Sequence, residues 1–483
     1  MARIYLAFAI IVLDVGYLCE FGSYFNFNGV FGTTSSAYFS NAPSLFGDLY
    51  YSPFLGMGFI FFHVLLTLLF LVGLKSLSFC FLFFMTTLSI QNYMLSHNIA
   101  SGADTFTAQI LFWFLLTPYN RVLSLNKSSI KEPDNDEVRT IWALYFFIVL
   151  VYFLTGILKT GDDWTREFTA IEYTLNSFYA SDIGRYLSSI SSQGVKNILT
   201  HLVRNWELLV PAVILIPNGT AKKNKIVAIS IVLFHAGLGI LTTPLMDFLL
   251  VFSTNAILIY PLTSSSLIVT KTESLFSWGR KFIIFEDKPI HKNIIRGLLT
   301  YGLLTSIITS IYSVIKVSPT KWLADLCQFT GTYQNWSMFA PEAPHSNWWV
   351  EIHGKSRDPS KKITNVINPA FETFTVPKNS ISYYGTRIGF SFFTYNFHPD
   401  ENESLAKKRE EIVKTTLFYY CSKYSDQFSA IDLNYLTTPI DIEGTKHKLS
   451  GKIKREHLGT LNCEKLKMEK EPLIPSDEYI SKK

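Results

Sequence analysis

The chain has 483 residues, of which 48% are apolar and only 17% are charged. Typical soluble domains have about 25% charged residues, so this composition argues against an ordinary soluble protein. The net charge of +5 comes without a long basic run, which argues against a nucleic-acid partner. Charged residues make up about 12% of the chain up to Lys316 and about 25% after it. We therefore expect a membrane domain at 1–316 and a soluble domain at 317–483.

Nine apolar stretches are long enough, or nearly so, to cross a hydrocarbon core of about 30 Å. The first one carries Asp14 and lacks a small-residue cleavage site before Glu20, so we interpret it as a retained helix rather than a signal peptide. The predicted spans are 4–19, 53–74, 76–95, 104–118, 139–158, 205–217, 224–244, 246–261 and 293–316.

The distribution of Lys and Arg predicts the orientation, because these residues prefer cytoplasmic loops. With a cytoplasmic N-terminus, the 20–52 loop lies outside and contains no Lys or Arg, whereas every predicted inner loop is basic. An odd number of spans places the 317–483 tail outside the cytoplasm, in a periplasm, a lumen or the extracellular space. The outer segment 159–204 breaks the trend, but it is also acidic, and the helical spacing of its apolar residues predicts amphipathic helices at the membrane surface.

The tail is expected to form a small mixed β-rich domain. Short, partly alternating apolar runs predict strands near Trp348–Ile352, 381–384 and 388–395, and one helix is predicted at about 403–424. The five cysteines show no metal-ligand spacing, so no metal site is predicted. Three of the cysteines lie in the tail, where at most one disulfide can form; they are Cys327, Cys421 and Cys463.

Ionisable side chains inside membrane spans are costly and often functional. His63 and His235 lie in the middle of predicted spans, where the simplest role is a hydrogen bond to a neighbouring helix. Asp14 and Asp247 lie near span ends, which favours solvation or helix capping. Lys159 follows an apolar run and precedes a polar turn.

Lys159 allows two interpretations. Its stem can lie along the membrane edge while its ammonium reaches water. Alternatively, burial disfavours the ammonium, and a neutral amine takes a proton from a weakly acidic, lipid-soluble substrate. Glu207 is expected to open the sixth span, where an acid in the first turn favours the helix dipole. His97, in a polar outer turn, is expected on the same side as Lys159.

The order of short motifs along the chain resembles the HTTM (horizontally transferred transmembrane) family, which includes the vitamin K-dependent γ-glutamyl carboxylases. Those carboxylases similarly have a lysine at a helix end shortly before an Asp-Trp pair, an acid opening a later span and a Phe-His pair in the next one. The resemblance covers most of 1–350 and rests on these motifs: Gly156-Ile157-Leu158-Lys159, Gly161-Asp162-Asp163-Trp164, Ala170-Ile171-Glu172-Tyr173, Trp206-Glu207-Leu208, Phe234-His235-Ala236-Gly237 and Trp336-Ser337-Met338-Phe339-Ala340-Pro341.

The resemblance implies a mechanism and a set of cofactors. In the family's carboxylases the matching lysine deprotonates vitamin K hydroquinone, oxygen adds, and the resulting alkoxide removes the γ-proton of a glutamate. Carbon dioxide then captures the carbanion that remains. By this resemblance Lys159 is the catalytic base on vitamin K hydroquinone or menaquinol, with O2 and CO2 as co-substrates. His235 would line the quinol-side cavity, Glu207 and Asp163 would be supporting polar groups, and Trp164 would be an aromatic wall.

Two functions of different classes follow. The first is a membrane enzyme that modifies glutamate in a peptide or protein substrate on the extracytoplasmic side, in contact with membrane lipids. The second is a non-enzymatic membrane factor for the maturation or export of a secreted peptide, in which Lys159 only anchors a helix. Secondary transport is the weakest option, because no inverted repeat is visible and the only Gly/Pro-interrupted span is the seventh.

Overall fold

The computed structural model describes most of the helical part of the chain and the core of the C-terminal part. Trp336 and Asp247, most of the predicted 246–261 span and most of the strands expected at 381–395 lie outside the described residues. The described residues are 2–25, 49, 52–97, 99–117, 119, 135–216, 221–242, 255–256, 292–333, 340–358, 360, 363–369, 384, 392–393, 396–397, 403–440 and 453–464.

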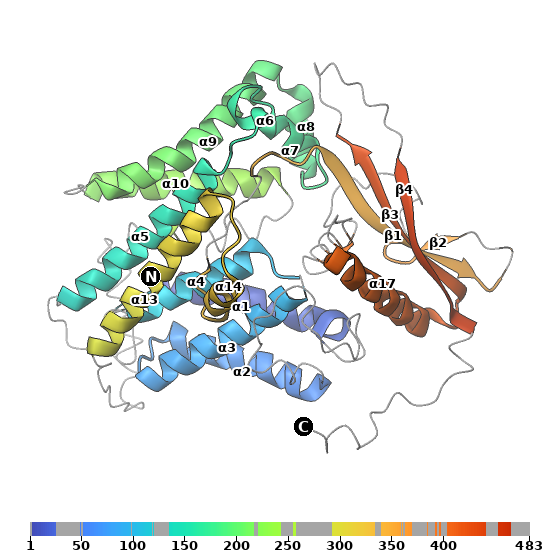
Figure 1. Ribbon diagram of the computed structural model, residues 1–483, viewed down its shortest axis with the longest axis horizontal. Helices are drawn as coiled ribbons and strands as arrows, with labels where there is room; N and C mark the ends of the chain where they lie inside the picture. Colours follow the sequence, from blue (N-terminus) through green and yellow to red (C-terminus); the bar gives the residue numbers. More distant parts are fainter. Residues whose placement is uncertain are drawn as a thin grey trace.

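Helices dominate the first two-thirds of the chain (Figure 1). Serines cap several of them: Ser52, Ser76 and Ser101 each accept a backbone N–H of the first turn, and Ser101 forms a reciprocal capping box with Asp104. The helices are α1 Ala2–Glu20, continued by the π-helical turn η1 Phe21–Phe25, α2 Pro53–Leu71, α3 Leu77–Ser96, α4 Gly102–Leu116, α5 Asn135–Ile157, α6 Asp162–Thr165, α7 Ala170–Asn176, α8 Asp182–Ile190, α9 Gln193–Leu215, α10 Ala221–Leu241, α13 Lys292–Val314 and α14 Lys321–Phe329.

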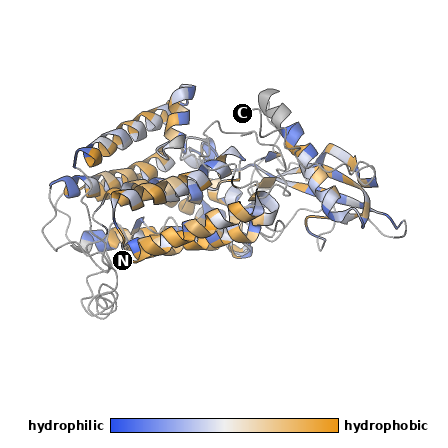
Figure 2. Ribbon diagram, turned by 90° about the horizontal axis from the view of Figure 1, so that it is seen from below, coloured by the Kyte–Doolittle hydropathy of each residue, from blue (hydrophilic) through white to orange (hydrophobic). Residues whose placement is uncertain are grey.

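Seven helices of the described part of the chain are long and apolar enough to cross a membrane, and α4 is a shorter apolar helix. Together they coincide with eight of the nine predicted spans, so a polytopic membrane-associated fold agrees with the sequence. Figure 2 shows apolar residues concentrated on this bundle. The sixth span differs from its prediction, because α9 begins at Gln193 rather than near residue 205.

The outer segment contains the predicted short helices α7 and α8. Apolar side chains of α8 and of the first turns of α9 are exposed, among them Ile183, Tyr186 and Ile198. This confirms an exposed apolar face on α8, whereas Ile171 and Leu175 of α7 are buried inside the protein rather than at its surface. Contact of the exposed face with lipid stays a prediction.

The C-terminal part contains a four-stranded antiparallel sheet in the order β2-β1-β3-β4 (Figure 1). The strands are β1 Ser346–Ser356, β2 Thr364–Asn365, β3 Phe428–Pro439 and β4 Lys454–Asn462, and the helix α17 Glu403–Tyr424 packs on β3 and β4. The predicted helix and first strand are therefore confirmed. Cys421 of α17 forms a disulfide with Cys463, and Cys327 is a buried free thiol.

Candidate functional site

Lys159 lies directly after the C-terminal end of α5, where this helix packs along α9. Gly156 allows the close approach of the two helices. A Cβ atom at position 156 would lie 2.9 Å from Leu208 Cδ2 and 3.2 Å from the Cβ of Glu207. The glycine therefore brings the end of α5 against the segment of α9 that carries the acid.

Lys159 and Glu207 form a buried ion pair. Lys159 Nζ lies 2.6 Å from Glu207 Oε2 and donates a second hydrogen bond to the carbonyl oxygen of Thr155, at 3.1 Å. Lys159 is only 2% exposed and Glu207 6%. The expectation that the ammonium of Lys159 reaches water is therefore wrong, because its charge is compensated inside the protein.

The predicted position of Glu207 in the first turn of a helix is also wrong. Because α9 begins at Gln193, Glu207 lies well inside the helix and its carboxylate cannot serve the helix N-terminus. Pro211 lies four residues further along α9. A proline has no N–H, so the backbone carbonyl of Glu207 loses its helical hydrogen bond and leaves a second acceptor near the pair.

Trp164 completes this group from the short helix α6. Its ring centroid lies 5.1 Å from Lys159 Nζ, within the range of a cation–π contact, and the side chain is buried. The aromatic-wall role expected for Trp164 fits this position. Together, Lys159, Glu207 and Trp164 place one amine, one carboxylate and one aromatic face in contact at a helix end.

Asp163, the neighbour of Trp164, points to a different partner. One carboxylate oxygen accepts the N–H of Ala343 at 2.6 Å and lies 3.6 Å from His345 Nε2. Burial raises the pKa of the Asp163 carboxyl, while the Ala343 N–H and His345 act in the opposite direction. Asp163 therefore connects the α6 turn to the segment that leads into β1, and a second hydrogen bond, from Gly161 N–H to Pro341 O, strengthens that connection.

His235 is connected to the Lys159–Glu207 pair through Tyr152 and Trp206. Tyr152 OH lies 2.8 Å from His235 Nε2 and 3.1 Å from Asn255 Nδ2. The amide of Asn255 donates to the phenol oxygen of Tyr152, and the direction of the Tyr152–His235 hydrogen bond depends on the tautomer of His235. Trp206, next to Glu207, packs edge-on against Tyr152.

Trp206 also stacks on Phe234 of α10, with ring centroids 3.8 Å apart. Both rings are half-buried, and the neighbouring Leu209 and Leu233 are exposed. This stacked pair joins α9 to α10 beside these exposed apolar side chains. The sequence did not identify Tyr152, Asn255 or Trp206 as site residues, since only the packing of α5, α9 and α10 brings them together.

His97 lies outside the group of residues around Lys159. Its Nδ1 lies 2.8 Å from the carbonyl oxygen of Tyr93, and its own carbonyl accepts a hydrogen bond from Asn396. The ring also packs against that of Tyr93, at 4.2 Å between centroids. The structure thus places His97 between the end of α3 and the C-terminal part, rather than in the group around Lys159.

A second buried ion pair has the same chemistry as the first. Lys196 Nζ of α9 lies 2.6 Å from Glu172 Oε1 of α7, and both side chains are buried. The pairing was not predicted, because 24 residues separate its members. Both residues belong to the outer segment 159–204, and the pair provides a comparison for Lys159–Glu207.

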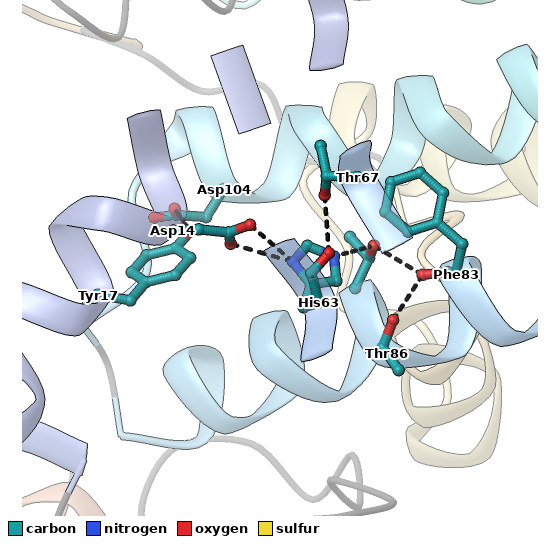
Figure 3. A network of polar contacts seen from close by, with 8 residues as sticks. Asp14, Tyr17, His63, Thr67, Phe83, Thr86 and Asp104 are labelled. Carbon is teal, nitrogen blue, oxygen red and sulfur yellow. Dashed lines mark hydrogen bonds and ion pairs between the residues drawn. The ribbon is translucent and has the colours of Figure 1, made fainter. Parts of the chain in front are cut away.

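Asp14 and His63 form a third buried pair, in the N-terminal helices (Figure 3). The hydrogen bond expected between His63 and a neighbouring helix is confirmed. Solvation or capping of Asp14 is wrong, because its side chain is 1% exposed and faces the His63 ring.

No family model, curated protein or solved structure matches this chain. Within the described ranges, no group of three or more His, Cys, Asp or Glu side chains is placed to hold a metal ion.

Proposed function

We propose that this protein is an integral-membrane enzyme of the HTTM family, similar to the vitamin K-dependent γ-glutamyl carboxylases, in which Lys159 acts as a base toward a lipid-soluble quinol. The observation that carries the proposal is the buried contact of Lys159 with Glu207 beside Trp164. An amine in this position meets the two requirements of the reaction, which are a nearby proton acceptor and exclusion of bulk water.

The pair can supply a neutral amine. The ion pair and the neutral amine–carboxylic acid pair differ only in which partner holds one proton. Desolvation of two charges in a low-dielectric site offsets much of their attraction, and the proposed reaction proceeds from the neutral form. In the neutral form the nitrogen of Lys159 has a free lone pair and can accept a proton from a substrate. The ring face of Trp164 then stabilises the ammonium that forms.

The surroundings suit a flat, apolar substrate that arrives from the membrane. The stacked rings of Trp206 and Phe234, beside the exposed Leu209 and Leu233, would hold an aromatic head group at the outer face of α9 and α10. A bound hydroquinone, either vitamin K hydroquinone or menaquinol, supplies an acidic hydroxyl and, with oxygen, the driving force for removing a glutamate γ-proton. His235 would contribute a polar atom to the quinol site and Lys159 the initiating base.

The predicted orientation agrees with a peptide substrate. With a cytoplasmic N-terminus, the Lys159 end of α5 and the sheet lie on the same extracytoplasmic side. The hydrogen bonds from Gly161 to Pro341 and from Ala343 to Asp163 link the two parts directly. A peptide or protein that approaches the sheet from the aqueous side would thus meet a quinol that enters from the lipid.

The second candidate, a non-enzymatic maturation or export factor, is favoured by one observation. The Lys196–Glu172 pair has the same 2.6 Å contact, so a buried Lys–Glu pair also occurs in the described residues away from Lys159. In the second candidate, Lys159–Glu207 would only fix α5 against α9.

The test uses purified protein in lipid with reduced vitamin K or menaquinol, a glutamate-containing peptide, oxygen and labelled bicarbonate. The proposal predicts quinone epoxide and fixed label in the wild type and neither product in Lys159→Ala. Epoxide without fixed label would indicate a quinol oxygenase or an unsuitable peptide. Absence of both products, under conditions in which a known carboxylase is active, would favour the maturation factor.

A further inference from the structure

A buried polar cluster joins α1, α2 and α3, apart from the Lys159 group. His63 Nδ1 lies 3.0 and 2.9 Å from the two carboxylate oxygens of Asp14 (Figure 3). His63 Nε2 lies 2.8 Å from Thr87 Oγ1. These three side chains are 2%, 1% and 6% exposed, in the order His63, Asp14 and Thr87. Ionisable residues inside membrane spans commonly mark sites of proton binding or transfer.

Counting hydrogens shows how many protons the observed geometry requires. Thr87 has one hydroxyl hydrogen, and its Oγ1 lies 2.9 Å from the carbonyl oxygen of Phe83. If that hydrogen is donated to Phe83, the Nε2 of His63 must itself donate to Thr87. The contact of Nδ1 with Asp14 then needs one more hydrogen, on the ring or on the carboxyl, and the cluster has no net charge.

A second state has one proton fewer. If the hydroxyl of Thr87 turns toward His63, Nε2 accepts and Nδ1 donates to the Asp14 carboxylate, so that the cluster has a net charge of −1. The carbonyl of Phe83 still accepts the hydroxyl of Thr86, at 2.9 Å. The two states therefore differ by one proton and by one rotation of a hydroxyl, with no movement of a helix.

A small cavity adjoins the cluster. It has about 20 Å³ of space, enough for one water molecule, and its lining includes His63, Thr87, Gln91, Thr107 and Asp104. Gln91 is 4% exposed, and its Oε1 has no hydrogen-bond partner among the described residues. A buried amide oxygen without a partner is costly, so this atom is suited to accept a hydrogen from a water in the cavity.

The cavity also leads toward the N-terminal end of α4. One oxygen of Asp104 accepts the hydroxyl hydrogen of Tyr17, and the other accepts the N–H of Ser101 at 2.6 Å, in the capping box. The carboxylate of Asp104 thus lies between the cavity and the turn that precedes α4. It provides an acceptor on the route from the cluster to the end of the helix.

We propose that the Asp14–His63–Thr87 cluster is a buried proton-binding site that releases and takes up one proton through a water molecule in this cavity. On release, the Thr87 hydroxyl hydrogen turns from the Phe83 carbonyl to the water and passes to it, while the Nε2 hydrogen of His63 passes to Thr87 Oγ1. The new Thr87 hydroxyl then donates back to Nε2. The resulting hydronium passes its proton toward Asp104. The titratable groups lining the cavity are Asp14 and Tyr17 of α1, His63 of α2 and Asp104 of α4, while α3 contributes the uncharged Thr87 and Gln91.

Nitrogen NMR of the full-length protein, labelled with ¹⁵N-histidine and held in lipid nanodiscs, tests this site. His63→Gln identifies the His63 signals. As the pH rises, Nε2 should change in one step from a proton-carrying to an accepting nitrogen. Thr87→Val should move the midpoint of this step by roughly one pH unit, because Nε2 loses its partner. Thr86→Val is the matched control and should leave the midpoint unchanged, since Thr86 contacts the same Phe83 carbonyl without touching the ring.

Two results would overturn the proposal. One is a His63 Nε2 signal that does not change over the whole pH range in which the protein stays folded. The other is an equal shift of the midpoint in Thr86→Val and Thr87→Val. Asp14→Asn should abolish the step, and if this variant does not fold, the comparison of the two threonine variants still decides the question.

Discussion

Removing one or both charges of the Lys159–Glu207 pair separates its contribution to stability from its contribution to chemistry. In Glu207→Leu the ammonium of Lys159 stays buried with the carbonyl of Thr155 as its remaining polar contact. Leaving one member of a buried pair uncompensated costs about 3–5 kcal/mol in the free energy of unfolding. Replacing both members, in Lys159→Met/Glu207→Leu, removes the buried charge, so the double variant should regain most of that loss or exceed wild-type stability by up to about 4 kcal/mol.

The assay is denaturant unfolding in mixed micelles, followed by the fluorescence of the nine tryptophans, together with product formation by each variant. We expect the single variant to be unstable and inactive, and the double variant to be stable and inactive. A double variant as unstable as Glu207→Leu would contradict the claim that an uncompensated charge causes the loss. A stable double variant with full activity would contradict the catalytic role of Lys159.

Three further predictions concern the surroundings of the site. Gly156→Ala should destabilise the protein by about 1–3 kcal/mol and reduce activity, because the new Cβ would press on Leu208. Thermal unfolding and the product assay measure both effects, and unchanged stability would contradict the close packing of α5 and α9. Cys421→Ser should lower the stability of the C-terminal part by about 4 kcal/mol, since the disulfide with Cys463 closes a loop of 42 residues. Protease resistance with and without reductant measures this loss, and equal resistance of variant and wild type would refute the prediction. Because burial raises the pKa of Asp163, the folded state binds this proton more tightly than the unfolded state, so its contribution to stability is present at acid pH and is lost as the pH rises through the folded pKa. Asp163→Asn keeps an acceptor for the Ala343 N–H and should flatten the pH dependence of the free energy of unfolding, measured from acid to neutral pH. An unchanged pH profile would contradict the contribution of Asp163.

Hydropathy predicted most of the helical architecture, because a membrane helix needs a long apolar run whatever its partners are. The start of α9 was missed for a physical reason. Its first turns alternate polar and exposed apolar residues, such as Lys196 and Ile198, and therefore lack the continuous apolar run that a hydropathy window detects. The helical pattern continues across the boundary between the outer segment and the span.

The site was predictable only in part. The position of Lys159 after an apolar run identified it as a candidate, but its partner depends on the approach of α9 at Gly156, which no local pattern encodes. The same is true of Asp14, whose position near a span end indicated solvation until the packing of α2 placed His63 against it. Pairing between buried charges is a property of helix packing, so sequence identifies the members without identifying the pairs.

Whether Lys159 acts as a base is tested by comparing Lys159→Arg with Lys196→Arg in the quinol and labelled-bicarbonate assay. Both substitutions keep a positive charge beside a buried glutamate, but an arginine cannot give up its proton at accessible pH. If Lys159 is the base, Lys159→Arg should abolish epoxide formation and label fixation in a folded protein, while Lys196→Arg should retain both products. Activity in Lys159→Arg similar to that of Lys196→Arg would contradict the role of Lys159 as a base.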